Sequence, residues 1–205
     1  MKVLYGFAYI LLNIIFRAFF RLKVHGTTNL PKGPAILAAN HQSYIDATAV
    51  GASMPEEIFY LAREDAFRFG LFRWLFRRVN SIMIQRRRAD RSALKEVLRK
   101  LAEGWKVLVF PEGTRSPDGS LQLPERGISL LAHKSGVPVV PTYVSGTHRV
   151  LPRGRTMIHF HPISVSFGKP FRFEEFLPQH GTHAAYEEFS LRVMDTIAQL
   201  KPDRE

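Results

Sequence analysis

The sequence predicts an α/β fold, a single domain in which a mixed, mostly parallel sheet is flanked by helices. Short apolar runs that end in polar loops alternate along the chain with segments of helical periodicity, which is the pattern of α/β proteins. The 205 residues, 45% of them hydrophobic and 23% charged, fit one globular domain with one core. We expect residues 24–205 to form this domain and residues 1–23 to form an N-terminal helix with a different role.

Residues Val3–Phe20 are almost all apolar and predict a helix that associates with a membrane interface. The run before Arg17 has about 14 residues, fewer than the ~20 that a spanning helix needs. Arg17 to Arg21 lacks the small residues that end a secretory signal. On a helical projection, a narrow stripe that we expect to face lipid headgroups holds Lys2, Gly6, Asn13, Arg17 and Arg21. The alternative is a helix packed on the protein's own core.

Apolar runs and helical spacing predict the remaining elements. Strands are expected at residues 35–39, 58–62, 80–85, 106–110 and 137–144, with one or two more in 156–167. Helices are expected at residues 44–52, 92–103, 127–135 and 186–200. Residues 24–34 predict a turn-rich connection. Pro138 and Pro141 place their strand at an edge or a bulge of the sheet, because proline has no N–H to donate.

The formal net charge of +11 implies an anionic partner, such as a membrane, a nucleic acid or an acidic protein. All of the excess lies in the first 92 residues, with +5 in residues 1–45 and +6 in residues 63–92. Residues 67–79 interleave aromatic residues with arginines, which suits the headgroup level of a membrane. A platform for single-stranded nucleic acid is the alternative. Because no recognised nucleic-acid motif accompanies the segment, we expect a phospholipid surface and no nucleic acid as the partner.

A candidate proton-transfer pair, His41 and Asp46, follows the buried strand predicted at residues 35–39. The carboxyl ends of strands are where open α/β sheets bind ligands. A neutral imidazole, with an unperturbed pKa of ~6.5, can take a proton from a hydroxyl, and a carboxylate on its other nitrogen fixes the tautomer. At this spacing the two side chains meet only if His41 lies in the loop and Asp46 on the first helical turn. The alternative is a surface histidine, a helix capped by Asn40 or Ser43, and an aspartate placed at the positive helix end.

Two more polar loops follow predicted strands, Arg86 to Arg88 and Glu112 to Arg115. Arginine can hold a phosphate through two hydrogen bonds at once, and Gly113 allows backbone to approach a ligand closely. Taken singly, these segments are typical of a solvated basic face and an ordinary turn. No metal or other cofactor is expected, since the chain has no cysteine and its histidines lack the spacing of metal ligands.

Four segments in order along residues 35–144 resemble the glycerolipid acyltransferases of the PlsC type. Residues 40–46 look like the family's His-x4-Asp block, and residues 110–116 match its acceptor block, Phe-Pro-Glu-Gly-Thr-Arg-Ser. Residues 82–86 are similar to its arginine block, although Asn80, Met83 and Gln85 stand where that block usually has glycine, phenylalanine and aspartate. Residues 137–141 resemble its proline-bracketed block. Ahead of Gly127 the chain has Glu125 and Arg126 where the family usually has phenylalanine and lysine.

The resemblance implies an O-acyltransferase that moves a fatty acyl group from acyl-CoA or acyl carrier protein to a lysophospholipid. It implies lysophosphatidic acid as the acceptor and the cytoplasmic face of the membrane as the location. His41 would be the general base with Asp46 as its partner, and a second set would hold the acceptor: Arg86, Glu112, Gly113, Thr114 and Arg115. Glycerol-3-phosphate or a phosphate-free lysolipid as acceptor, and a non-catalytic lipid-binding protein, are the alternatives.

Overall fold

The computed structural model describes all residues except 1–2, 64–79, 85–90, 177–181 and 203–205. Within these described ranges one sheet has the strands β1 Lys23–His25, β2 Ala35–Ala39, β3 Ile58–Arg63, β4 Ser81–Ile84, β5 Lys106–Val109, β6 Val139–Ser145 and β7 Ser164–Phe167. The α-helices are α1 Val3–Phe20, α2 Asp46–Ser53, α4 Arg91–Ala102, α5 Gly127–Ser135, α6 Thr147–Val150 and α7 Thr182–Gln199. Two short 3₁₀ segments are η1 Thr27–Asn29 and η3 Phe173–Phe176.

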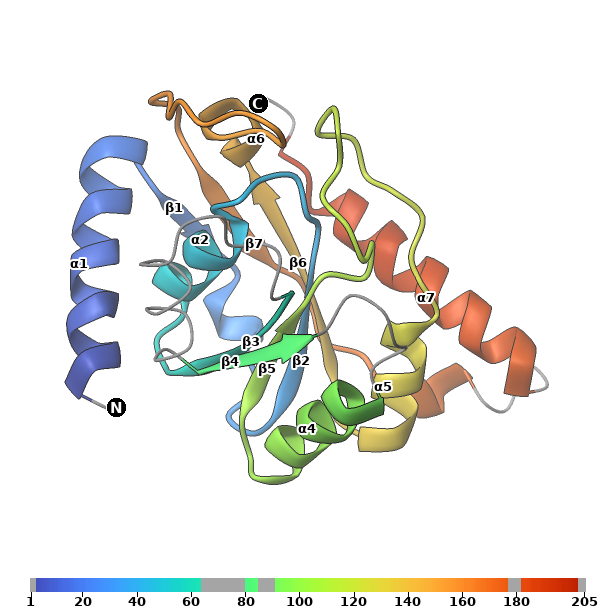
Figure 1. The fold of residues 1–205 in the computed structure, drawn as a ribbon. Coiled ribbons are helices and arrows are strands. Elements are labelled where there is room, and N and C mark those ends of the chain that lie inside the picture. Colours follow the sequence, from blue (N-terminus) through green and yellow to red (C-terminus); the bar gives the residue numbers. More distant parts are fainter. Residues whose placement is uncertain (1–2, 64–79, 85–90, 177–181, 203–205) are drawn as a thin grey trace.

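The sheet has the order β1-β7-β6-β2-β5-β3-β4 (Figure 1). All of its neighbouring pairs are parallel except β6 and β7, which are antiparallel. The predicted fold class, a mixed and mostly parallel sheet flanked by helices, is therefore confirmed. With β5 on one side and β6 on the other, β2 lies inside the sheet, and its five residues are all buried.

Helices cover both faces of the sheet, and each face has its own core. Alternate residues of β2 point to opposite faces, so Leu37 packs in the core beneath α1 and α2 while Ile36 packs in the core beneath α4, α5 and α7. Figure 1 shows α1 and α2 on one side of the sheet and α4, α5 and α7 on the other. Strand β2 is thus fixed by both cores, which holds its carboxyl end in place.

The proline-bearing strand was predicted at an edge or a bulge, and the edge is wrong, because β6 is hydrogen-bonded on both sides. The carbonyl oxygen of Pro141 accepts a hydrogen bond from Gly168 N at 2.8 Å, so the missing N–H faces the same neighbour, β7. On the two sides of Pro141 the antiparallel register differs by one residue, since Val139 pairs with Phe171 and Thr142 pairs with Phe167. Pro141 therefore lies where the antiparallel pairing is irregular, which is a place where a sheet tolerates a missing donor.

One other expectation needs correction, and another is met in part. The connection predicted over residues 24–34 contains part of a strand, since β1 pairs in parallel with β7. The alternating stretch predicted over residues 156–167 forms a strand only at β7, and residues 156–163 have no regular structure. Both differences arise at one edge of the sheet, where short strands depend on partners far away in the sequence.

Helix α1 has one face on the core and one face exposed. One face is buried in the core cluster that also contains residues of α2, through Tyr5, Phe16 and Phe20. For this face the alternative interpretation, a helix packed on the protein's own core, is therefore correct. Large apolar side chains are exposed on the rest of the helix, namely Phe7, Ile10, Leu11, Ile14 and Phe19. Asn13, expected to face headgroups, instead donates a hydrogen bond to Ala52 O at the end of α2, at 2.7 Å. Among the helices of the described ranges, none is long and apolar enough to cross a membrane.

We expect Gly51→Ala to destabilise the protein, although alanine is the better helix former. A Cβ at Gly51 would lie 2.1 Å from the Tyr60 hydroxyl, which also contacts the Tyr5 hydroxyl of α1 at 3.3 Å. Overpacking typically costs about 1–3 kcal/mol, more than the ~1 kcal/mol gained in helix propensity. In a Tyr60→Phe background the clashing oxygen is gone and the loss should largely disappear. Denaturant unfolding measures the free energy of unfolding with and without Gly51→Ala in the wild-type and in the Tyr60→Phe background. An equal loss of stability in the two backgrounds would contradict this packing.

Candidate active site

The polar loops that follow β2 and β5 lie side by side at the carboxyl edge of the sheet, because these strands are parallel neighbours. The loop after β2 comprises residues 40–45 and leads directly into α2. The loop after β5 begins at Phe110 and contains Glu112 to Arg115. A hydrogen bond of 2.7 Å from Ser116 N to His41 O joins the two loops.

His41 and Asp46 are in direct contact, with 2.8 Å between Nδ1 of His41 and Oδ2 of Asp46. His41 lies in the loop and Asp46 is the first residue of α2, which is the arrangement that their spacing required. The Asp46 side chain is fully buried and that of His41 is 20% exposed. Since a carboxylate only accepts, Nδ1 carries the hydrogen of this bond, and a neutral ring then has its free lone pair on Nε2.

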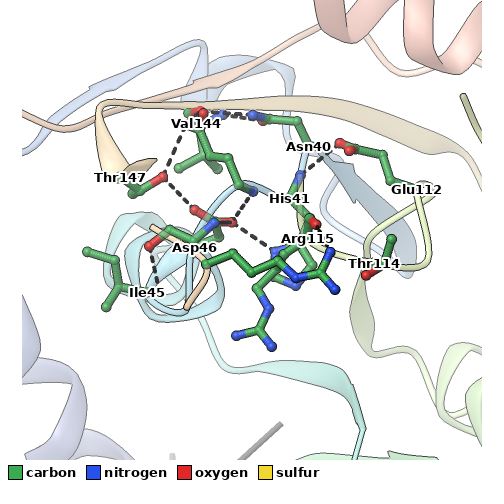
Figure 2. A network of polar contacts seen from close by, with 12 residues as sticks. Asn40, His41, Ile45, Asp46, Glu112, Thr114, Arg115, Val144 and Thr147 are labelled. Atoms are coloured by element: carbon green, nitrogen blue, oxygen red, sulfur yellow. Dashed lines mark hydrogen bonds and ion pairs between the residues drawn. The ribbon is translucent and has the colours of Figure 1, made fainter. Parts of the chain in front are cut away.

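The Asp46 carboxylate is fixed by several donors (Figure 2). Its Oδ2 accepts hydrogen bonds from the backbone N–H groups of Gln42 and Ser43, both at 2.7 Å. Its Oδ1 accepts from the Thr147 hydroxyl at 2.5 Å, and Gln42 Nε2 donates in turn to that hydroxyl at 3.1 Å. A buried carboxylate needs such bonds to offset its lost hydration. They also fix the side chain that orients His41.

The His41 ring is held in place by stacking and by its own backbone. It lies on the Phe110 ring with 3.9 Å between centroids and 15° between planes. The backbone N–H of His41 donates to Oε1 of Glu112 at 2.8 Å. Phe110 and Glu112 both belong to the loop after β5, so that loop fixes the position of the histidine that the β2 loop supplies.

The first residue after β2 anchors the loop to the neighbouring strand. Asn40 Oδ1 accepts from Val144 N at 2.7 Å, and Asn40 Nδ2 donates to Val144 O at 3.0 Å. Its side chain thus pairs with β6 as another strand residue would. Neither Asn40 nor Ser43 caps α2, whose cap residue is Ile45 and has no side-chain cap bond.

Glu112, expected on the acceptor side, has both carboxylate oxygens bonded to protein donors. Besides the bond from His41, Oε2 accepts from Gln122 Nε2 at 3.0 Å. Burial raises the pKa of the Glu112 carboxyl above its ordinary 4.5, while the bonds from His41 and Gln122 act in the opposite direction. These contacts make Glu112 a positioning residue for His41.

Arg115 provides a cation at the site. Its guanidinium lies over the Tyr44 ring at 3.6 Å from the ring centre, and its carbonyl oxygen accepts from Arg153 Nη1 at 3.1 Å. Thr114 is exposed beside it (Figure 2). Gly113 has φ +66°, and a Cβ there would lie 2.7 Å from Oε1 of Glu125, so the turn itself requires glycine.

Two segments singled out in the sequence lie outside the described residues: the arginine run Arg86 to Arg88 and residues 67–79. In the part of the chain that the structure describes, no group of three or more His, Asp and Glu side chains could hold a metal ion. The described part of the site is therefore His41 and Asp46 next to the guanidinium of Arg115.

Comparison with known proteins identifies the class. The family model for acyltransferases matches residues 21–145. A chloroplastic 1-acyl-sn-glycerol-3-phosphate acyltransferase of Arabidopsis thaliana is 31% identical over 157 residues, which is 74% of this chain and 44% of the relative. The chain spans about half the length of the plant relatives that it matches. The chain belongs to the acyltransferase family, which confirms the resemblance seen in its four motifs.

Two bacterial proteins match over most of their length. The 1-acyl-sn-glycerol-3-phosphate acyltransferase of Bacillus subtilis is 26% identical over 172 residues, covering 82% of this chain and 83% of the relative. The crystal structure of the 1-acyl-sn-glycerophosphate acyltransferase PlsC from Thermotoga maritima has a TM-score of 0.77 and 26% identity. That match covers 98% of this chain and 83% of the other.

Sequence reasoning missed three residues that build the site: Tyr44, Gln122 and Thr147. Tyr44 lies within the His-x4-Asp block, and an aromatic there could have been weighed as a platform for an arginine. Thr147 is 101 residues away from Asp46 along the chain. No local signal links the two, because only the pairing of β6 with β2 brings them together.

We expect Thr147→Val to destabilise the fold by about 1–3 kcal/mol, because Oδ1 of the buried Asp46 would lose its donor. Thr147→Ser keeps the hydroxyl and should lose clearly less. Denaturant unfolding of the two variants measures the difference. Equal losses would mean that the methyl packing of Thr147, and not its hydroxyl, stabilises this region.

Proposed function

We propose that the chain transfers a fatty acyl group from an acyl thioester to the free hydroxyl of lysophosphatidic acid, which gives phosphatidic acid. One observation carries the proposal: His41, partly exposed, is bound through Nδ1 to the fully buried Asp46, with the Arg115 guanidinium in the adjoining loop. The relatives in Arabidopsis and Bacillus subtilis are named for this acceptor. The proposal extends that activity to this chain.

In the proposed reaction the acceptor hydroxyl attacks the thioester carbonyl carbon while Nε2 of His41 takes the hydroxyl proton. Asp46 stabilises the imidazolium that forms. The tetrahedral intermediate then expels the thiolate, which takes the proton back from Nε2 as the C–S bond breaks. The products are an ester and a thiol, and the protein regains its starting state. A thioester is already activated, so the chemistry needs no covalent acyl-enzyme.

The donor would be acyl-CoA or acyl carrier protein, and neither the reaction nor the site requires a further cofactor. Both donors are acidic, and the excess positive charge of the first 92 residues would attract either one. On the acceptor side, the planar fork of Arg115 suits a phosphate monoester. Tyr44 beneath it limits the directions in which that fork can point.

The reaction would take place on the cytoplasmic face of a membrane, where a lysophospholipid acceptor is anchored. The exposed apolar side chains of α1, such as Phe7, Ile10 and Ile14, support contact with a membrane. Because the opposite face of α1 belongs to the protein core, the helix would lie along the interface and stay packed on the domain.

His41→Ala should lower the rate of acyl transfer by about 10²–10⁴-fold, the usual contribution of a general base, without changing the unfolding midpoint greatly. Asp46→Asn should lose nearly as much activity. Release of free thiol from acyl-CoA in the presence of lysophosphatidic acid measures the rate. His25→Ala, an exposed histidine on β1, is the matched control and should keep the wild-type rate. A His41→Ala variant with more than about a tenth of that rate would refute the base assignment.

Arg115→Lys tests the acceptor, because lysine keeps the charge and loses the planar fork. We expect a loss of about tenfold or more with lysophosphatidic acid and little change with a monoacylglycerol that has the same acyl chain. The quantity measured is the ratio of the two rates, read by mass spectrometry of the products. Arg192→Lys on α7 is the matched control.

If Arg115→Lys lowers the rate equally with the two acceptors, Arg115 has a structural role, and the proposal that it binds the acceptor phosphate is refuted. Gly113→Ala is unsuitable for this purpose, because its positive φ and its contact with Glu125 would damage the loop with any acceptor. A wild-type protein that turns over no acyl thioester with either acceptor would favour a non-catalytic lipid-binding protein.

A further inference from the structure

The loop between α6 and β7, residues 151–163, exposes large apolar side chains. Met157 is 70% exposed, Ile158 54% and Phe160 73%. Single exposed hydrophobic residues are ordinary on protein surfaces, whereas a contiguous group indicates a contact surface. This group is not part of the His41 site and is not explained by it.

The α6–β7 loop continues the exposed apolar face of α1. The Phe160 ring lies 5.8 Å from that of Phe19 and 5.9 Å from that of Phe20. Ile163 N donates to Phe20 O at 2.9 Å, so the end of the loop is fixed to the end of the helix. Figure 1 shows the loop, in orange, beside the C-terminal end of α1. Helix and loop together form one surface.

The other end of the loop is fixed to the candidate active site. The Ser43 hydroxyl donates to Leu151 O at 2.6 Å, and Pro152 forms a bridge with Ser43. Arg153 donates to the carbonyl of Arg115. A short loop therefore connects the exposed end of α1 to the residues around His41.

The segments that form this surface carry charges of one sign. The sequence has no aspartate or glutamate between residues 126 and 173, and none before Asp46. The loop and the short helix before it contribute Arg149, Arg153 and Arg155, and the end of α1 is followed by Arg21 and Lys23. Apolar side chains and cations on segments that contain no acid complement an anionic bilayer, which offers hydrocarbon beneath a layer of negative headgroups.

We propose that the α6–β7 loop is a second membrane-contacting element, with Met157, Ile158 and Phe160 inserted between the headgroups of an anionic bilayer beside α1. The inference rests on the membrane location in the proposed function, and it adds how the molecule is oriented on that membrane. With two elements in contact, the molecule cannot roll about α1. The mouth of the site near Arg153 and Arg115 is then held at headgroup level, where an acceptor lipid can enter without leaving the bilayer.

The test uses the absence of cysteine from the chain, which makes single labelling sites clean. Met157→Cys and, as the matched control, Leu191→Cys are each labelled with an environment-sensitive fluorophore. Leu191 is 43% exposed on α7, which covers the opposite face of the sheet. Vesicles of phosphatidylcholine with phosphatidylglycerol, with and without nitroxide-labelled lipid, are then added to the full chain.

The proposal expects a blue shift and nitroxide quenching at position 157 and neither effect at position 191. A label at 157 that stays in water while the protein sediments with the vesicles overturns it, as does a protein that does not sediment. A blue shift at 157 that grows with protein concentration in the absence of lipid would assign the surface to a second copy of the chain and also overturn it. None of these measurements depends on acyl transfer, so they test membrane contact by the loop even if the protein proves to have no acyltransferase activity.

A second measurement removes the apolar contact without a label. In a second variant, serine replaces all three apolar residues of the loop (Met157→Ser, Ile158→Ser and Phe160→Ser). Its partition coefficient onto the same vesicles, measured by sedimentation, should fall by about tenfold or more, since each apolar side chain that enters the bilayer favours partitioning. Leu191→Ser should leave it unchanged. Equal sedimentation of both variants and wild type would assign all of the binding to other segments. Deleting α1 would not serve here, because Tyr5, Phe16 and Phe20 are part of the core.

Discussion

The candidate site depends on one buried anion, the carboxylate of Asp46. It is fully shielded from solvent, and it is satisfied by two backbone N–H groups, one hydroxyl and the ring of His41. Three of these donors come from the turn between β2 and α2, and the fourth, Thr147, comes from the residues after β6. The carboxylate therefore sets the shape of the turn as well as the orientation of the imidazole, so a substitution of Asp46 itself would alter the fold and the chemistry together.

The position of β2 explains why residues from distant parts of the chain meet there. Its neighbours β5 and β6 are both parallel to it, so three carboxyl ends lie at the same edge of the sheet. Each contributes a different part: β2 the histidine, β5 the loop that stacks on the ring and binds its backbone, and β6 the anchor at Val144 for Asn40 and Gln42. The rigidity of the site comes from the sheet and not from the loops alone.

The sequence predicted those parts of the fold that local patterns determine. The strands around Leu37 and Leu108 are continuous apolar runs bounded by polar loops. The spacing of His41 and Asp46 required a loop and a first turn if the two side chains were to meet, and left a surface histidine as the alternative. Other features depend on distant partners. The three residues of β1 form a strand only because β7 lies beside them. Pro141 is tolerated inside the sheet because the antiparallel register shifts by one residue there. Asn13 faces α2 through a contact that no helical projection reveals.

The pairing of β1 with β7 has a consequence for how the chain is made. Lys23 pairs with Ser164, so the strand that follows α1 leaves the ribosome about 140 residues before its partner exists. At the usual 5–20 residues per second, the interval is roughly 7–28 seconds. Throughout it, the side of α1 that later packs in the core has no complete core to join. Until β7 is made, the nascent protein thus presents an apolar helix without its complete core, and a lipid surface that covered it in this interval would let the rest of the domain fold beside that surface.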